Sequence, residues 1–288
     1  MITTLRSLLQ HAEKHNCAVL APDFHSLVIA RAFMEQAEEM SAPLILSYVV
    51  GFKPIMDVRQ YRDFIAIVRK EIEQFSVPVC LHLDHAEHLE DIREAIDLGF
   101  TSVMIDASTK PYQENIALTQ QTVELARSHQ VSVEAELGTI TSGDDYVHQS
   151  KAQAFFTDPD QAADFVNQTE IDALAVSIGN VHGAYHGEPM IDFERLTALD
   201  RQVQVPLVLH GTSGIGSDNL KKAIGLGIRK INLYTDIIRE MHANMLSALS
   251  NSLTDTFAVV NAQRAGAQQV LTEYINLLGD FQLDKFQK

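Results

Sequence analysis

The stretch PVCLHLDHAEHLEDIREAIDLGFTSVMI, residues 78–105, contains one complete strand–helix–strand unit. Its first residues, 78–83, form a short apolar run that is typical of a buried strand. Residues 88–98 then place apolar side chains at helical spacing, and Gly99 follows as a helix stop. A second apolar run occupies 101–105. Because a helix separates the two runs, they are predicted to be parallel strands of a sheet that helices cover.

The same alternation continues along the whole chain. Short apolar, β-branched runs predict strands at 18–22, 43–48, 78–83, 101–105, 131–135, 172–178, 206–209 and 229–233. Helical spacing predicts helices at 26–39, 57–75, 88–98, 112–128, 159–168 and 217–226. Eight strands favour an α/β fold, the (β/α)8 TIM barrel, as a single domain over residues 1–288. A doubly wound open sheet is the alternative, but no GxGxxG follows the first strand, and 214–219 reads GIGSDN.

Composition excludes several classes of partner. The chain has 288 residues, of which 46% are hydrophobic, and 22 basic against 38 acidic residues give a net charge of −16. Such a chain repels nucleic acid and anionic membranes, so neither is expected as a partner. Cys17 and Cys80 form no CxxC motif, the N-terminus is an amphipathic helix pattern rather than a signal or transit peptide, and no apolar run reaches membrane-span length. These features favour a cytoplasmic location.

Every predicted strand ends in a hydrogen-bonding or ionisable side chain, and active sites of such barrels lie at those ends. The third strand alone supplies several ionisable groups, which are costly to bury unless they are paired, bind a metal or face a cavity. In chain order, the strand ends carry Asp23, Ser47, Asp84 with His85, Asp106, Glu134 with Glu136, Asn180 with His182, His210, and Asn232 with Thr235 and Asp236. The sequence therefore predicts one polar site at this end of the barrel.

Three histidines stand at such ends: His85, His182 and His210. A lone histidine is more often an ordinary core or surface residue, but three on different strands can converge. Three neutral imidazoles suit Zn²⁺ and leave its fourth position open for a substrate. No HExxH motif is present, so a zincin-type protease is excluded.

Glycines provide a second signal beside these histidines. The segments NVHGAY at 180–185 and HGTSG at 210–214 place glycines just past strand ends, where backbone amides can approach an anion closely. Barrels often bind phosphate near the loops after strands 7 and 8. Ordinary turn glycines are the alternative for each instance alone. The predicted substrate- and phosphate-binding residues are Ser47, Gly183, Gly211, Ser213, Asn232 and Thr235.

With these motifs in place, the chain resembles the class II, zinc-dependent ketose-bisphosphate aldolases, in particular their tagatose-bisphosphate aldolase-like branch. The matching segments are LHLDHAEHLEDIREAIDLGFTSVMIDAS (81–108), SVEAELGTI (132–140), DALAVSIGNVHGAY (172–185), VPLVLHGTSGI (205–215) and KINLYTDI (230–237). The resemblance covers the chain from about residue 15 to the end of strand 8.

The resemblance implies a barrel in which Zn²⁺ is held by His85, His182 and His210, with Asp84 as the catalytic acid/base. Glu136 is similar to a glutamate that contacts the metal in an alternative position. The resemblance also implies dihydroxyacetone phosphate bound by the glycine loops, a monovalent cation (Na⁺ or K⁺) near the phosphate, and a homodimer or homotetramer. Aldol cleavage through a Schiff-base lysine is disfavoured, because strand 6 has no lysine and Lys230 lies at the start of strand 8.

Several positions depart from the family pattern. The long polar connection at 138–158 is expected to be a mobile lid, but it lacks the family's glutamate, and Asp144 or Asp145 is the nearest candidate for that proton-transfer role. Asp23 replaces a common Asn, Asn180 a common Thr or Ala, and Tyr234 a smaller side chain. These changes leave a second hypothesis open: a barrel that binds zinc or a sugar phosphate without turnover.

The far end of the substrate has no evident phosphate cradle, and no arginine lies in the last 24 residues. A second phosphate would be held poorly without a charge-assisted pair. A substrate phosphorylated only at the dihydroxyacetone end is therefore expected. If a distal phosphate were bound, Arg264, Lys53 or a neighbouring subunit would be the first candidates to hold it.

Overall fold

The computed structural model describes residues 1–55, 58–141, 155–185, 187–251 and 255–286. Within these residues, eight parallel strands form one sheet in the order β1-β8-β7-β6-β5-β4-β3-β2. The strands are β1 (Val19–Pro22), β2 (Leu44–Val49), β3 (Val79–Ala86), β4 (Ser102–Ile105), β5 (Ser132–Leu137), β6 (Ala173–Val176), β7 (Leu207–Leu209) and β8 (Ile228–Leu233). All eight lie where the sequence predicts strands, and they confirm the (β/α)8 barrel.

The sheet closes on itself between its two edge strands. A single parallel bridge joins Asp23 to Ser47 just beyond β1, and the amide of Phe24 donates to the carbonyl of Ser47 at 2.9 Å. The barrel is therefore nearly closed, and its seam ends at the face where the polar strand ends gather.

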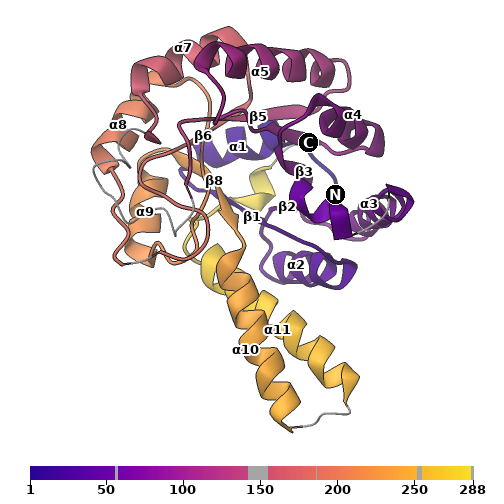
Figure 1. Cartoon of the computed structure of the whole chain (residues 1–288). Coiled ribbons are helices and arrows are strands. Elements are labelled where there is room, and N and C mark those ends of the chain that lie inside the picture. The colour runs from indigo at the N-terminus through magenta and orange to yellow at the C-terminus, as the bar shows by residue number, and fades with distance from the viewer. Residues whose placement is uncertain (56–57, 142–154, 186, 252–254, 287–288) are drawn as a thin grey trace.

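Helices alternate with the strands along the chain, and most of them surround the barrel, as Figure 1 shows. They are α1 (Leu5–Lys14), α2 (Leu27–Glu39), α3 (Val58–Ile72), α4 (Leu89–Leu98), α5 (Tyr112–Arg127), α7 (Pro159–Thr169), α8 (Phe193–Gln202), α9 (Ser217–Gly225), α10 (Thr235–Asn251) and α11 (Thr256–Ile275), with short 3-10 turns η1 (Val50–Ile55) and η4 (Leu283–Lys285). Helix α8 was not predicted, although Asp192 caps it by accepting from the amide of Arg195. Gly99 ends α4 in a left-handed conformation, as expected.

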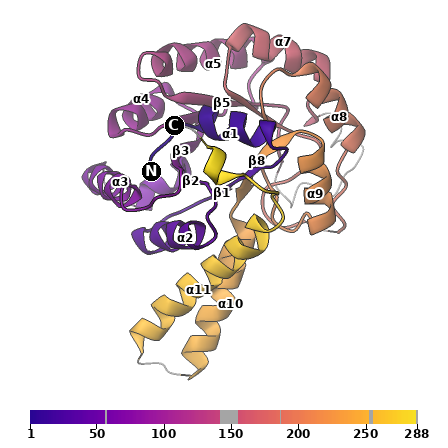
Figure 2. The same cartoon turned by 180° about the vertical axis from the view of Figure 1, so that it is seen from behind.

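The interior of the barrel changes character along its axis. At the amino ends of the strands, Leu5, Leu8 and Leu9 of α1 pack against Val19 and Ile45 in a fully apolar cluster. Figure 2 shows α1 lying across this end of the barrel. Alternation along each strand keeps one row of side chains on the inside of the barrel. At the other end of the barrel, the side chains in this inner row are polar. Helix α1 therefore closes one end and leaves the site at the other.

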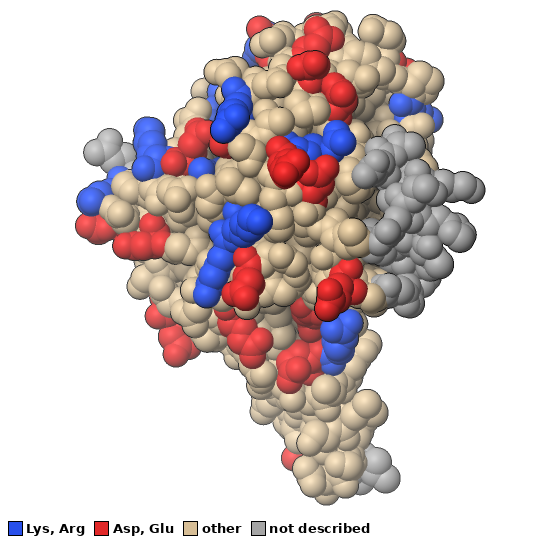
Figure 3. All heavy atoms as spheres, turned by 90° about the vertical axis from the view of Figure 1, so that its left-hand side faces the viewer, with Lys and Arg blue, Asp and Glu red and all other residues tan. Residues whose placement is uncertain are grey.

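Helices α10 and α11 form a hairpin that projects from the barrel in both Figure 1 and Figure 2. The hairpin carries exposed apolar side chains near its far end, including Leu246 at 68% and Phe257 at 82% relative exposure. Among the described residues, no helix combines the length and apolar character needed to cross a membrane. On the face shown in Figure 3, acidic and basic side chains are intermixed and form no broad basic area.

Candidate active site

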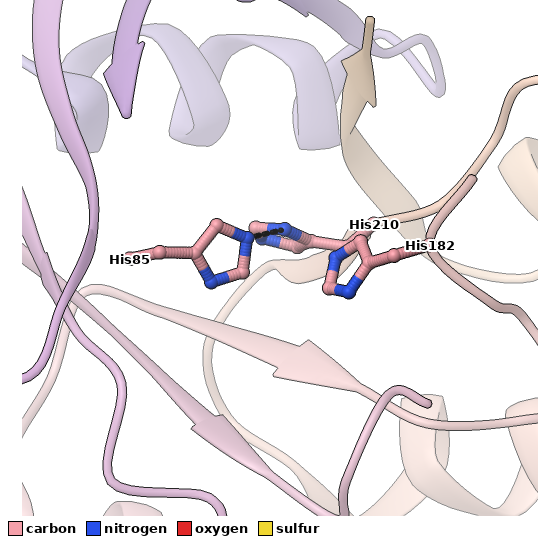
Figure 4. Close-up of side chains that lie close together, drawn as sticks. All are labelled: His85, His182 and His210. Carbon is pink, nitrogen blue, oxygen red and sulfur yellow. Dashed lines mark hydrogen bonds between the residues drawn. The ribbon is translucent and has the colours of Figure 1, made fainter. Parts of the chain in front are cut away.

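Three histidine rings from three separate strands meet at the carboxyl end of the barrel. His85 lies within β3, His182 in the loop after β6, and His210 directly after β7. The ring centroid of His85 lies 5.0 Å from that of His182 and 4.8 Å from that of His210. Figure 4 shows the rings pointing toward one another from opposite sides of the barrel. The structure therefore brings these three residues together.

The geometry of these nitrogens fits a metal ion. Each histidine offers a ring nitrogen, and the three atoms lie within 4.8 Å of one another. Nδ1 of His210 lies 3.2 Å from Nε2 of His85. Zn–N bonds of about 2.0–2.1 Å in a tetrahedron place ligand nitrogens roughly 3.3 Å apart. Nε2 of His182 is buried and has no hydrogen-bond partner among the described residues, so it too is free to bind an ion.

A β-bulge brings His85 into this site. Strict alternation would place His82 and Asp84 inside the barrel and His85 outside. The register between β3 and β4 shifts between Leu83 and Ala86, and His85 has a left-handed φ of 51°. Such bulges re-aim a side chain, and strained backbone of this kind clusters at functional sites. Consecutive residues Asp84 and His85 can therefore both face the cavity.

Carboxylates hold two of the histidines in a defined orientation. Asp106 lies 2.8 Å from Nδ1 of His85, and Glu134 lies 2.9 Å from Nε2 of His210. Each carboxylate accepts one ring N–H and thereby leaves the opposite nitrogen directed at the centre of the site. Asp106 is itself held by the amide and hydroxyl of Ser108. The sequence placed Asp106 and Glu134 at strand ends but assigned them no role.

Asp84 is an ionised carboxylate beside the histidines. Its side chain is 1% exposed, and Oδ2 accepts from Nδ2 of Asn232 at 3.0 Å. Burial opposes ionisation, but the neighbouring His85 outweighs it and holds the pKa of Asp84 well below its usual range. Neighbouring Asp23 shows the reverse, because burial and the charge of Asp84 raise its pKa well above the usual value. The pKa values of the two buried acids are therefore shifted in opposite directions.

Glu136 faces the same cavity. One of its oxygens accepts from the amide of Ile140 at 3.3 Å, while Oε2 is buried without a partner among the described residues. Burial and the charge of Asp106 raise the pKa of Glu136 to about 8. With His85 and Asp106 it forms a second group of donors close enough to hold an ion.

The glycine loops after β6 and β7 are packed against each other. Gly211 has a φ of 62°, and a Cβ there would lie 2.1 Å from the carbonyl oxygen of Val181, so only glycine fits. The hydroxyl of Tyr185 donates to the carbonyl of Gly211 at 2.9 Å. Asn180 donates to the carbonyl of His210 at 3.0 Å. The unusual Asn180 thus ties the two loops that carry His182 and His210.

The histidines and glycine loops share one cavity of about 500 Å³. Its lining includes the predicted phosphate-binding residues Gly183, Gly211, Ser213, Asn232 and Thr235, together with Asp84, Glu136 and the three histidines. Thr235 is the first residue of α10, and a helix N-terminus favours an anion. The sixth predicted residue, Ser47, does not line the cavity, and its Oγ is buried without a partner in the described part of the chain.

Another part of the cavity wall is aromatic and acidic. The rings of Phe52 and Tyr234 are tilted against each other with centroids 5.6 Å apart, and Asp23 and Glu87 also line the cavity. The described residues that line the cavity include no lysine or arginine. Any cation that reaches this wall must come from elsewhere.

Both nearby cations named from the sequence are already engaged with acids. Lys53 binds Asp91 and Glu94 at 2.7 Å each, and Arg264 pairs with Glu35. Neither Lys53 nor Arg264 lines the cavity.

Lys230 lies near the start of β8, as expected. Its long side chain extends into the barrel, where Nζ lies 2.6 Å from Oε2 of Glu134. It still does not line the cavity, so it offers no amine to a substrate there. The predicted lid acids Asp144 and Asp145 lie outside the described residues.

A barrel whose carboxyl end brings together three histidines able to hold a metal ion and a buried acid is typical of a class of metal-dependent barrel enzymes. Comparison with known proteins identifies the family: residues 3–282 match the family model described as class II fructose-bisphosphate aldolase. The chain belongs to this family, whose members typically use a divalent metal. It is therefore an aldolase, a carbon–carbon lyase, and the hypothesis of binding without turnover is set aside.

Solved structures support the same conclusion. The X-ray structure of the YdjI aldolase from Escherichia coli K12 is 32% identical, with a TM-score of 0.86 and full coverage of both chains. A fructose-bisphosphate aldolase (Fba) from Campylobacter jejuni is 20% identical, covers 96% of this chain and 95% of its own, and has a TM-score of 0.82. The second likeness supports the fold alone.

Proposed function

We propose that this aldolase is zinc-dependent and reversibly cleaves a ketose 1-phosphate, or a ketose bisphosphate, to dihydroxyacetone phosphate and an aldehyde. The observation that carries the proposal is the combination of three converging imidazole nitrogens with an ionised Asp84 in one cavity. His85, His182 and His210 would hold the ion, and Glu136 offers an alternative ligand. When bound, Zn²⁺ acts as a Lewis acid that polarises the ketone and stabilises developing negative charge.

Asp84 supplies the acid–base step. Its carboxylate removes the proton from the hydroxyl that becomes the aldehyde, and returns that proton in the condensation direction. The hydrogen bond from Asn232 keeps the carboxylate oriented without neutralising it. Asp84 is therefore charged before the reaction begins, as a base must be.

The phosphate of dihydroxyacetone phosphate would lie against Gly183, Gly211 and Ser213, with Asn232 and Thr235 beside it. Ser213 supports this arrangement, because its hydroxyl accepts from the amide of Asp236 at 3.1 Å and so joins the β7 loop to the start of α10. The resemblance to the family adds a monovalent cation near this phosphate. Activity measured with K⁺, Na⁺ or a bulky organic cation at constant ionic strength tests that addition.

A substrate with one phosphate fits the cavity better than a bisphosphate. The part of the wall formed by Phe52, Tyr234 and Asp23 carries no cation, and Lys53 and Arg264 are already paired with acids. Hydroxyl groups of the aldehyde portion can instead bond to Asp23. This wall thus favours an uncharged, hydroxylated aldehyde.

The lid role of Asp144 or Asp145 remains our proposal, supported by the sequence. One of these carboxylates would move the proton at the carbon of dihydroxyacetone phosphate that forms the carbon–carbon bond: it would remove the proton before condensation and return it after cleavage. Solvent-tritium exchange into this compound should fall in Asp144→Ala or Asp145→Ala. Unchanged exchange in both variants would exclude the two acids.

A homodimer or homotetramer is proposed on the basis of the α10–α11 hairpin. Its exposed Leu246 and Phe257 form an apolar end, and the projecting hairpin is largely uncharged toward its tip in Figure 3. Sedimentation of the wild type and of Phe257→Ser tests this, and a wild-type monomer at micromolar concentration would contradict it. The composition and the two buried cysteines support a cytoplasmic location.

The central experiment combines metal analysis with turnover. Purified protein should contain about one zinc per chain, and a coupled assay for dihydroxyacetone phosphate should report cleavage across a panel of ketose phosphates. Borohydride with substrate should not inactivate the enzyme, because no Schiff base forms. Full activity after exhaustive removal of metal would overturn the zinc-dependent mechanism.

A further inference from the structure

A buried ionic cluster lies inside the barrel, below the cavity floor. Lys230 and Glu134 are both 0% exposed, and so is His82. Nζ of Lys230 lies 2.6 Å from Oε2 of Glu134 and 3.1 Å from Nε2 of His82. None of the three lines the cavity, so the proposed chemistry does not use them directly.

Such a cluster needs an explanation, because removing a lysine and a glutamate from water is costly, and a buried pair is weak evidence for stability. Small neighbours make room for it: the inward positions of β6 are Ala173 and Ala175. The ammonium also occupies the space among His82, Asp84 and Glu134, which would otherwise be a group of donors suited to a cation. Lys230 thus brings the positive partner of an ion pair into the interior of the barrel.

Glu134 connects this charge to the metal-binding histidines. Its Oε2 accepts from Lys230, and its Oε1 accepts from Nε2 of His210 at 2.9 Å. Each carboxylate oxygen therefore has one strong donor, which fixes the plane of the carboxylate. A fixed carboxylate holds the N–H of His210 at Nε2 and turns Nδ1 toward His85, 3.2 Å away.

His82 is the second partner of the same lysine. Because the ammonium has only donors, Nε2 of His82 accepts from Lys230, and Nδ1 donates to the hydroxyl of Ser102 at 2.8 Å. Nε2 lies 3.4 Å from Oδ1 of Asp84 but has no proton to donate to it, so His82 holds the lysine in place and makes no hydrogen bond to that carboxylate. The hydrogen bonds that start at Lys230 therefore reach the active site through Glu134.

We propose that Lys230 is a positioning residue: through Glu134 it orients the ring of His210 toward the metal site, while His82 helps to hold the lysine in place. The part that concerns the metal rests on the proposed zinc dependence. The part that concerns the orientation of His210 does not, because the hydrogen bonds are formed by the protein alone.

The experiment is a double-mutant cycle on zinc affinity, measured by competition with a chelator of known affinity. The variants are Lys230→Met, Glu134→Gln and the double variant, with Lys221→Met on the exposed face of α9 as the matched control. Lys230→Met and Glu134→Gln should each weaken zinc binding about 10–100-fold, as loss of supporting contacts to metal ligands does. The double variant should lose no more than Glu134→Gln alone, and Lys221→Met should match the wild type.

A merely structural role would give different results. Leu8→Ala, which creates a cavity at the far end of the barrel, serves as a control of reduced stability. If Leu8→Ala weakened zinc binding as much as Lys230→Met, or if the two single losses multiplied in the double variant, the proposal would be overturned. If Lys230→Met did not fold, comparison of the double variant with Glu134→Gln would still decide, because equal zinc affinity is required.

A second measurement separates this inference from the zinc-dependent mechanism. In metal-free protein, ¹⁵N NMR should show the proton of His210 on Nε2 in the wild type and in Lys221→Met. That preference should be lost in Lys230→Met and Glu134→Gln. If the wild type bound no zinc but showed this pattern, the proposed mechanism would fail and the positioning role would stand, while an unchanged tautomer in both variants would overturn the role.

Discussion

The two ends of this barrel are built from the same eight strands, yet they follow opposite rules. At the amino end, Leu5, Leu8 and Leu9 of α1 fill the interior with apolar side chains that are 0% exposed. At the carboxyl end, buried oxygens and nitrogens of Asp84, Glu136 and His182 lack partners within the described residues. The first end stabilises the fold, and the second keeps groups unsatisfied so that a metal and a substrate can satisfy them.

The contrast teaches that burial alone does not tell the role of a residue. Leu8 and Asp84 are almost equally hidden from water, at 0% and 1% exposure. Substitution of Leu8 removes packing contacts and should lower stability. Substitution of Asp84 removes a buried charge that costs the fold free energy, so it should affect the reaction more than the stability. The two ends should therefore respond to mutation in different measurements, and the following experiments can confirm or break that separation.

The largest effect is expected for the histidines. His85→Ala, His182→Ala and His210→Ala should each lose bound zinc and with it essentially all turnover, because three protein ligands are the minimum for a catalytic site. Metal analysis and the coupled assay measure both properties. Retention of stoichiometric zinc in any one variant would show that this histidine is not a ligand.

The second effect concerns Asp84. Asp84→Ala should lower kcat by about 10²–10⁴-fold, the usual contribution of general acid–base catalysis. Zinc content should stay near that of the wild type, because Asp84 is not one of the three proposed ligands. Activity within a few-fold of the wild type would mean that another group moves the proton.

The third effect belongs to the amino end. Leu8→Ala should lower the free energy of unfolding by about 2–5 kcal/mol through lost contacts and a residual cavity. Below the unfolding transition, zinc affinity and kcat should remain within about twofold, a margin that corresponds to roughly 0.4 kcal/mol. Denaturant titration gives the stability, and a matching loss of kcat at low temperature would show that the two ends are coupled.

The smallest effect concerns the part of the cavity wall that Phe52, Tyr234 and Asp23 form. The value of kcat/KM for a ketose 1-phosphate should equal or exceed that for the matched 1,6-bisphosphate, because no cation among the described lining residues can pair with a second phosphate. Tyr234→Ala, which opens this wall, should change the ratio without changing zinc content. A tenfold or greater advantage for the bisphosphate would reveal a distal site, supplied by a neighbouring subunit or by residues outside the described ranges.

The sequence by itself determined the barrel, because strands of 4–8 apolar residues followed by amphipathic helices can bury their backbone only in a helix-covered parallel sheet. It also determined which residue types stand at the strand ends, and hence the histidine set, Asp84 and the glycine loops. Helix α8 was missed although Asp192 signals its start, so that error lay in reading a local pattern.

Only the tertiary structure decided how those groups are held. A bulge in the pairing of β3 with β4 turns His85 inward. Two further contacts join residues that are distant in the sequence: Asp106 pairs with His85, and Asn180 bonds to His210. Lys230 is the clearest case, since it stands at the wrong end of β8 by residue number and still reaches Glu134. The physical reason is that the sequence pattern defines where each strand ends. The point that a long side chain reaches depends instead on which neighbouring side chains leave space for it.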